Sequence, residues 1–511
     1  QVPGAEMIEE YFPDDPDGFL YKLQPWFEFN NTNSRSMGFS NNSWRTLNNF
    51  FTTGGVRKLA RYRWNYLVRA AQGTANNYTN VFALTDAANL SGNPAQAAGL
   101  EAVADMEQWM RIFAVRHSVG DWDSFGTQNS QNMYGYKPLN GKWTLFIWDM
   151  NIVLGNSGSW SPGQNLFAVN GADGPMQRIY NNPPFRRAYW RALKEIASGP
   201  MDSSRIGPVL DAKYAAFRAE GLNVTSPAAV KSWIASARNS ILSQAATVDP
   251  STLTVNGPTS LTTSDNVVVL TGSAPVAVKT IAVNGIPYPV TWSSVTAWTL
   301  RVPVNSGTNP LALQGLDHRG SPVSNTATTL SVTYTGTVEQ PQDFIVINEI
   351  LHSPALANAA FLEIYNRSTR FTFDLSNFRF NGLDYTFPPG ASIGPQSFLV
   401  LAKDRAAFNA ASGNSIPVFD QFNGKLDPDG ETLTLIKPGS APAEDVVVSK
   451  VRYGLKPPWP PLPANSGVSL QLIDPNQDVR RAGNWAVSDV PPFSTPGRDN
   501  SVRKILSPFP A

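Results

Sequence analysis

Three side chains close together in the sequence have the types needed to hold a divalent cation and to assist phosphoryl transfer. Asp123 and Asn132 lie shortly before Asp149, which ends a strongly apolar run within residues 131–155, a segment expected to form a hairpin. In phosphoryl transfer an aspartate orients the attacking hydroxyl, while oxygen ligands hold a Mg²⁺ ion against the phosphates. This stretch therefore offers one base and two oxygen ligands.

A structural role is the alternative for both aspartates. Asp149 follows Trp148 and precedes an apolar segment at 152–154, so it is also placed to cap the hairpin. Asp123 lies in a loop whose backbone its carboxylate is able to order. Residue types and spacing leave both interpretations open.

Helices are expected to position these residues. Apolar residues at helical spacing, with acidic residues early and basic residues late, predict a buried helix over residues 99–120 that leads into the loop of Asp123. We expect three further helices to pack beneath the hairpin. They cover residues 184–198, 207–220 and 227–246.

Composition narrows the range of functions. The chain has 511 residues, of which 15% are charged, and its formal net charge is +1. A nearly neutral chain has no long-range field to attract nucleic acid or an anionic membrane, so neither is expected as a partner. Cysteine is absent, which excludes disulfides and thiolate zinc sites, and no apolar run reaches the about 18 residues that suggest a membrane span.

The pattern changes after residue 249, where apolar and polar residues begin to alternate between turn signals. We therefore expect a multidomain chain, with an α+β unit over 1–249 followed by two all-β sandwiches of immunoglobulin type, over 250–337 and 343–490. Residues 491–511 are expected to be a C-terminal tail or the start of a further domain. The expected strands cover residues 266–271, 279–285, 298–304, 311–315, 344–350, 361–366, 398–402 and 431–436.

The second β unit resembles a lamin-tail domain over about residues 344–486. The residues Asn-Glu-Ile at 348–350 and Glu-Ile-Tyr-Asn at 363–366 carry this resemblance. It implies a module for binding or assembly and no chemistry. Glu349 and Glu363 are candidate cation ligands, but carboxylates on alternating strands are expected to face solvent or to serve the structure.

The N-terminal unit resembles the spore-coat CotH-type kinases over about residues 7–245. Matching motifs are the Asp-Trp-Asp loop that ends at Asp123, the run Asn-Met-Tyr-Gly-Tyr from Asn132, and the pair Trp-Asp that ends at Asp149. The resemblance implies the C-terminal lobe of an atypical protein-kinase fold. It implies that Asp123 is the catalytic-loop aspartate, Asn132 a metal or loop-ordering ligand, and Asp149 the main Mg²⁺ ligand.

Three positions depart from the pattern of that family. Asp121 stands where Asn is usual, Gln131 where His is usual, and Asn151 where a second Asp is usual. Asn151 remains a candidate metal ligand through its amide oxygen, but a neutral ligand attracts a divalent cation less strongly than a carboxylate does. A lowered affinity for Mg²⁺ is therefore expected.

The nucleotide poses a larger difficulty. Kinase-like sites hold the phosphates with a lysine on a strand and a glycine-bearing loop, and the residues before Lys22 contain neither element. The chain alone is therefore not expected to bind ATP well.

Two functional hypotheses follow. The preferred one is a secreted bacterial protein, extracellular or at the cell surface, with a structural, adhesive or assembly role. Its kinase-like unit would be an inactive scaffold, its partner a protein or a cell surface, and its β domains would mediate assembly. The alternative is an extracellular CotH-type protein kinase, using ATP and Mg²⁺ on Ser or Thr, whose nucleotide lobe lies on sequence outside this segment.

Overall fold

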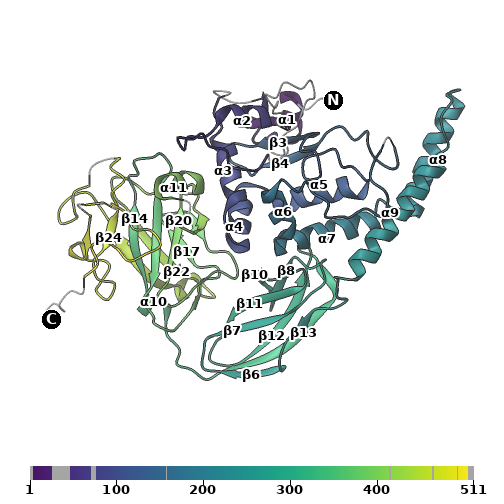
Figure 1. Ribbon diagram of the computed structural model, residues 1–511. Coiled ribbons are helices and arrows are strands. Elements are labelled where there is room, and N and C mark those ends of the chain that lie inside the picture. The colour runs from purple at the N-terminus through teal and green to yellow at the C-terminus, as the bar shows by residue number, and fades with distance from the viewer. Residues whose placement is uncertain are drawn as a thin grey trace. The chain divides into compact units, whose positions relative to one another are not determined.

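The computed structural model divides the chain into two compact units (Figure 1). The first contains Gln1–Leu253 with the segments Ser273–Lys279 and Trp292–Trp298, and the second contains the rest. The first is α+β and the second is rich in β-strands that form several sheets. The structure describes residues 4–25, 46–70, 76–156, 158–413, 416–462, 465–488, 490–491 and 493–504, so the end of the expected tail over 491–511 lies outside the described residues.

The sheet of the first unit brings the expected hairpin next to an earlier strand. Its order is β2-β1-β3-β4, with antiparallel neighbours. Met133 pairs with both Leu23 and Ile147, so β1 ends, β3 begins and β4 ends at the same edge of the sheet. The chain therefore leaves Asn132 and Asp149 at that edge. The four strands are β1 (Phe19–Leu23), β2 (Tyr66–Ala70), β3 (Met133–Lys137) and β4 (Thr144–Ile147).

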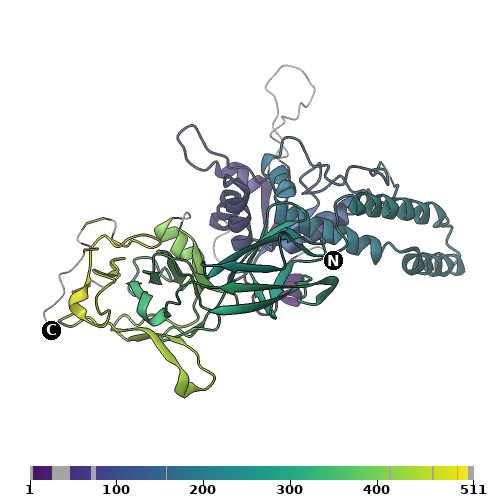
Figure 2. The ribbon, with the colours of Figure 1, turned by 90° about the horizontal axis from the view of Figure 1, so that it is seen from below.

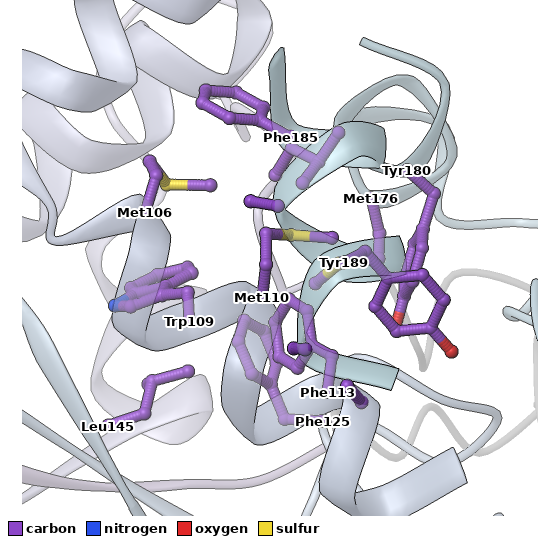
Figure 3. Packing of buried hydrophobic residues seen from close by; sticks show 14 of the residues in the cluster. Met106, Trp109, Met110, Phe113, Phe125, Leu145, Met176, Tyr180, Phe185 and Tyr189 are labelled. Carbon is purple, nitrogen blue, oxygen red and sulfur yellow. The ribbon is translucent and has the colours of Figure 1, made fainter. Parts of the chain in front are cut away.

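Helices of the first unit bury a core of aromatic and methionine side chains. Figure 3 shows these side chains converging from α5, α6 and α7. The ring centroid of Tyr180 lies 5.8 Å from that of Phe113 and 5.2 Å from that of Tyr189, so aromatic packing joins the three helices. The described helices of this unit are α1 (Ala5–Tyr11), α2 (Leu59–Asn65), α3 (Thr79–Asn89), α4 (Asn93–Val103), α5 (Met106–Ser118), α6 (Gly174–Asn181), α7 (Pro183–Ser198), α8 (Ser203–Ala219) and α9 (Ala228–Ala246).

The single helix expected over 99–120 is two helices, α4 and α5. The first ends at Val103, and Asp105 caps the second, because its side chain accepts a hydrogen bond from the Gln108 amide at 3.0 Å. The preceding residue, Ala104, forms an isolated β-bridge with Trp143 of the hairpin. The break therefore attaches the start of α5 to the hairpin.

The helix expected over 207–220 is present as α8, but it does not pack beneath the hairpin. No residue of α8 is buried and α8 projects from the rest of this unit (Figure 2), whereas α9 packs against α7 and α5 and buries residues such as Trp233 and Ile241. No helix in the described part of the chain is long and apolar enough to cross a membrane.

Residues 254–334 form two sheets, with strand orders β10-β11-β7-β5 and β6-β13-β12-β8-β9. The strand expected over 311–315 instead begins at Gly307 and includes Asn309 and Pro310, because β12 pairs with the long strand β13 along this stretch. The strands are β5 (Thr254–Val255), β6 (Ser260–Thr263), β7 (Val267–Ser273), β8 (Thr280–Val283), β9 (Ile286–Tyr288), β10 (Val290–Trp292), β11 (Ala297–Pro303), β12 (Gly307–Leu316) and β13 (Pro322–Tyr334).

Residues 341–486 form a six-stranded sheet of order β21-β20-β15-β14-β24-β25, a four-stranded sheet of order β18-β17-β22-β23, and the pair β16-β19. Every residue of β14 and β15 is buried. The α-helices and strands of this region are α10 (Pro341–Phe344), β14 (Ile345–Leu351), β15 (Phe361–Asn366), β16 (Phe373–Asp374), β17 (Arg379–Asn381), β18 (Tyr385–Thr386), β19 (Ser392–Ile393), β20 (Phe398–Ala402), α11 (Arg405–Ser412), β21 (Val418–Gln421), β22 (Thr432–Lys437), β23 (Val446–Arg452), β24 (Leu470–Leu472) and β25 (Trp485–Ala486).

Candidate functional site

The candidate site lies where the loop after α5 meets the edge of the sheet. That loop is fixed by its own hydrogen bonds, because the Thr127 hydroxyl donates to the Trp122 carbonyl at 2.7 Å and the Phe125 amide donates to the Gln131 carbonyl at 2.7 Å. Gly126 packs against the ring of Phe113, and a Cβ atom at this position would lie 2.3 Å from that ring. A glycine with φ of +88° is therefore required for the loop to approach α5 this closely.

Asp123 is surrounded by carboxamide side chains. Its Oδ1 accepts hydrogen bonds from Asn129 and, at 2.6 Å, from Gln131. Its Oδ2 accepts a hydrogen bond from Nδ2 of Asn132 at 3.0 Å. A carboxylate has about four lone-pair sites, so these donors leave about one for a further partner.

Asn132 directs its amide nitrogen toward Asp123, since Nδ2 also donates to the Asp123 carbonyl at 2.8 Å. The amide oxygen of Asn132 therefore points to the other side, and it has no hydrogen-bond donor among the described residues. The structure thus brings Asp123 and Asn132 into direct contact and leaves one oxygen ligand available.

Asp149 exposes its carboxylate, which accepts no hydrogen bond within the described part of the chain. Its backbone carbonyl accepts a hydrogen bond from Arg116 at 3.1 Å, and the Asn132 carbonyl accepts one from the same guanidinium group. The two expected ligands therefore lie on either side of one arginine side chain.

Asn151 is exposed and contributes only its backbone to a described contact. Its carbonyl oxygen accepts a hydrogen bond from Nδ2 of Asn156 at 2.9 Å. The structure does not bring its side chain into contact with Asp123, Asn132 or Asp149. Its amide oxygen is therefore the least constrained of the candidate ligands.

The donor set suits a hard cation that keeps part of its coordination shell for water or phosphate. No group of three or more His, Cys, Asp or Glu side chains among the described residues is arranged to hold a metal ion. Magnesium is commonly bound by one or two carboxylates together with phosphates and water, so an unpaired carboxylate and an amide oxygen are chemically suitable ligands for that ion. Asp149 and Asn132 carry these groups and are the candidate ligands.

Sequence reasoning did not find two residues that organise this site. Sequence patterns place Arg116 only among the basic residues late in the expected helix, and Asp121 only as a departure from the family pattern. In the structure Arg116 is 0% and Asp121 1% exposed, and the two form an ion pair. Burial raises the pKa of Asp121, while the Arg116 guanidinium and the Asp123 amide act in the opposite direction.

Glu349 and Glu363, which were expected to face solvent or to serve the structure, are both buried on paired strands. Glu349 accepts hydrogen bonds from the Ser469 hydroxyl at 2.5 Å and the Thr495 amide at 2.7 Å. Glu363 accepts hydrogen bonds from Nδ2 of Asn348 at 2.8 Å and from the amide of residue 497 at 2.5 Å. Asn348 and Ser469 lie within the expected domain, and residues 495 and 497 lie in the segment after it, so both carboxyl groups serve the internal structure of this β-rich region.

Comparison with known families agrees with the two resemblances. Residues 40–232 match the family model described as CotH kinase protein, and residues 339–454 match the model of the Lamin Tail Domain. The residues of the candidate site fall inside the first match, and the buried glutamates fall inside the second. A comparison with curated proteins found no match. The chain therefore contains a CotH kinase domain in its α+β region and a lamin tail domain in its β-rich region.

Proposed function

We propose that the CotH kinase domain of this chain holds a divalent cation through Asp149 and Asn132 and uses it for phosphoryl transfer. The observation that carries the proposal is the shared attachment of these two residues to Arg116. Both adopt left-handed backbone conformations, with φ of +55° at Asn132 and +48° at Asp149. Such conformations cost energy in non-glycine residues and occur often at functional sites.

The chain's own side chains divide the chemistry between them. Asp123 orients a hydroxyl nucleophile through the lone pair that its three carboxamide partners leave open. Asp149 supplies negative charge and Asn132 a neutral oxygen at the edge of the sheet. A bound Mg²⁺ ion supplies charge neutralisation for the phosphates.

We further propose that the protein acts outside the cell or at the cell surface. In this account residues 250–337 are an immunoglobulin-like sandwich, and the lamin tail domain binds a protein or surface partner or mediates assembly. The α+β unit corresponds to the C-terminal lobe of a kinase-like fold. The near-neutral charge of the chain, +1 overall, supports a partner that is not nucleic acid.

An inactive scaffold is the second candidate function. It is favoured by the three amide donors that already occupy Asp123 and by the neutral side chain of Asn151, where the family has a carboxylate. In this case the domain would hold a cation weakly and transfer no phosphate, and the protein would act through its β domains.

Phosphate incorporation separates the two candidates. Purified protein is incubated with radiolabelled ATP, Mn²⁺ and casein or histone, and the Asp149→Ala variant is compared with wild type. The exposed Asp14 of the same unit provides the control Asp14→Ala. Incorporation that is lost in Asp149→Ala and kept in Asp14→Ala supports phosphoryl transfer. Equal background in all three proteins contradicts phosphoryl transfer by this chain.

A further inference from the structure

We infer that Arg116 is the positioning residue of the cation site and that Asp121 neutralises it, so that the pair fixes Asn132 and Asp149 without repelling the cation. This inference rests on the proposed cation site. It assigns a role to residues whose side chains themselves touch neither cation nor substrate.

All four terminal N–H groups of the Arg116 guanidinium donate hydrogen bonds at the site. Nη1 donates to the Asp121 carboxylate and, at 3.1 Å, to the Asp149 carbonyl. Nη2 donates to the Asn132 carbonyl and, at 2.5 Å, to the Trp148 carbonyl. The Nε–H group has no hydrogen-bond acceptor among the described residues, so the hydrogen bonds of this side chain there all go to these four acceptors.

Three of these acceptors belong to the two segments that carry the cation ligands. The guanidinium group is planar and rigid, so it sets the separation of the carbonyls that it joins. Asn132 and Asp149 both adopt left-handed conformations, and both have their own carbonyl bonded to Arg116. The arginine therefore braces the backbone of both ligands, together with the Trp148 amide, which donates to the Asn132 carbonyl at 3.2 Å.

The role of Asp121, the second residue of the pair, follows from its charge. A buried guanidinium beside a cation site would repel the cation, because interactions between charges are strong where water is excluded. Asp121 is itself buried, and its other oxygen, Oδ1, accepts a hydrogen bond from the Asp123 amide at 3.0 Å. Its negative charge cancels that of Arg116, and the carboxylates of Asp123 and Asp149 are left as the net charge near the cation.

The test compares Arg116→Lys with Arg187→Lys. Lysine keeps the positive charge but cannot span four acceptors with one nitrogen. Arg187 is a matched control, because it is 1% exposed in the same unit and donates to carbonyls of residues 274, 275, 278 and 295, away from the site. Mn²⁺ affinity is measured by titration, and amide hydrogen exchange is measured over residues 130–133 and 148–151.

We expect Arg116→Lys to weaken Mn²⁺ binding by about tenfold or more and to speed exchange in those two segments. Arg187→Lys should leave the affinity and those two segments unchanged. Wild-type exchange and affinity in Arg116→Lys would overturn the inference. If wild type binds no Mn²⁺, the proposed cation site fails, and the exchange rates still decide whether Arg116 positions the two segments.

Asp121→Asn tests the role of the Asp121 charge, because it removes that charge and keeps the guanidinium group of Arg116. We expect it to fold, to keep slow exchange near Asn132 and Asp149, and to bind Mn²⁺ about tenfold more weakly, because Arg116 is then uncompensated. Unchanged or tighter Mn²⁺ binding in this variant would overturn the role of Asp121. This variant also keeps the inference testable if Arg116→Lys fails to fold.

Discussion

The paired carboxyl groups of Glu349 and Glu363 predict that the lamin tail domain loses stability as the pH rises. Burial raises the pKa of Glu349 from 4.5 to about 7, and burial together with the neighbouring Glu349 raises the pKa of Glu363 well above its usual value. The folded domain therefore binds more protons than the unfolded chain above pH 4.5. The contribution of this pair to stability is greatest at and below that pH and falls as the pH rises through the folded pKa values.

The size of the effect follows from the shift at Glu349. A rise from 4.5 to about 7 corresponds to about 3 kcal/mol, lost almost completely by pH 8, and Glu363 acts in the same direction. With a urea dependence of about 1–3 kcal/mol per molar, the unfolding midpoint should fall by about 1–3 M. Urea unfolding followed by tryptophan fluorescence at pH 5, 6, 7 and 8 measures this change.

Glu349→Gln identifies the relevant transition. The glutamine oxygen is able to accept from Ser469 and the Thr495 amide, and its amide group is able to donate to the Thr495 hydroxyl, which now lies 3.1 Å from Oε2. The variant should therefore fold and flatten the pH dependence. The exposed Glu444 provides the control Glu444→Gln, which should leave it unchanged. A midpoint that stays level or rises from pH 5 to 8 in wild type would refute the reasoning.

Two further predictions concern the first unit. Asn151→Asp adds a carboxylate at the neutral ligand position and should raise Mn²⁺ affinity by about tenfold in a calorimetric titration, and an unchanged affinity would place residue 151 outside the site. Arg187→Ala removes the donor of hydrogen bonds to four carbonyl groups, of which that of Pro275 keeps the Val278 amide as a second donor, and should lower the free energy of unfolding by about 3 kcal/mol or more. Chemical denaturation measures this loss, and the partly exposed neighbour in Arg186→Ala should cost much less.

Local patterns were enough to predict much of the secondary structure. Short apolar runs between turn residues predict the hairpin of β3 and β4 and the strands β14, β15, β20 and β22. The structure contains these elements near the expected positions. Asp123, Asn132 and Asp149 lie close in the chain, so a loop and a hairpin suffice to bring them to one edge of the sheet.

Features that depend on tertiary contacts were missed. The break between α4 and α5 depends on the bridge from Ala104 to Trp143, and β13 was not expected although it pairs with β12 along most of its length. The exposure of α8 likewise depends on tertiary packing, because a helix is buried only where other elements leave a surface for it to cover.

Sequence patterns also do not predict the role of Arg116. An arginine near the end of a helix is ordinarily exposed and interacts with the helix dipole. Its burial follows from the sheet edge lying over this turn of the helix and from Asp121 being five residues further along the chain to neutralise it. An acidic residue at that spacing from an arginine was the available signal.

Mn²⁺ binding followed by electron paramagnetic resonance decides whether Asp149 is a cation ligand. We expect one saturable Mn²⁺ site in wild type and in Asp14→Ala, and its loss in Asp149→Ala. Identical Mn²⁺ isotherms for wild type and Asp149→Ala would contradict it.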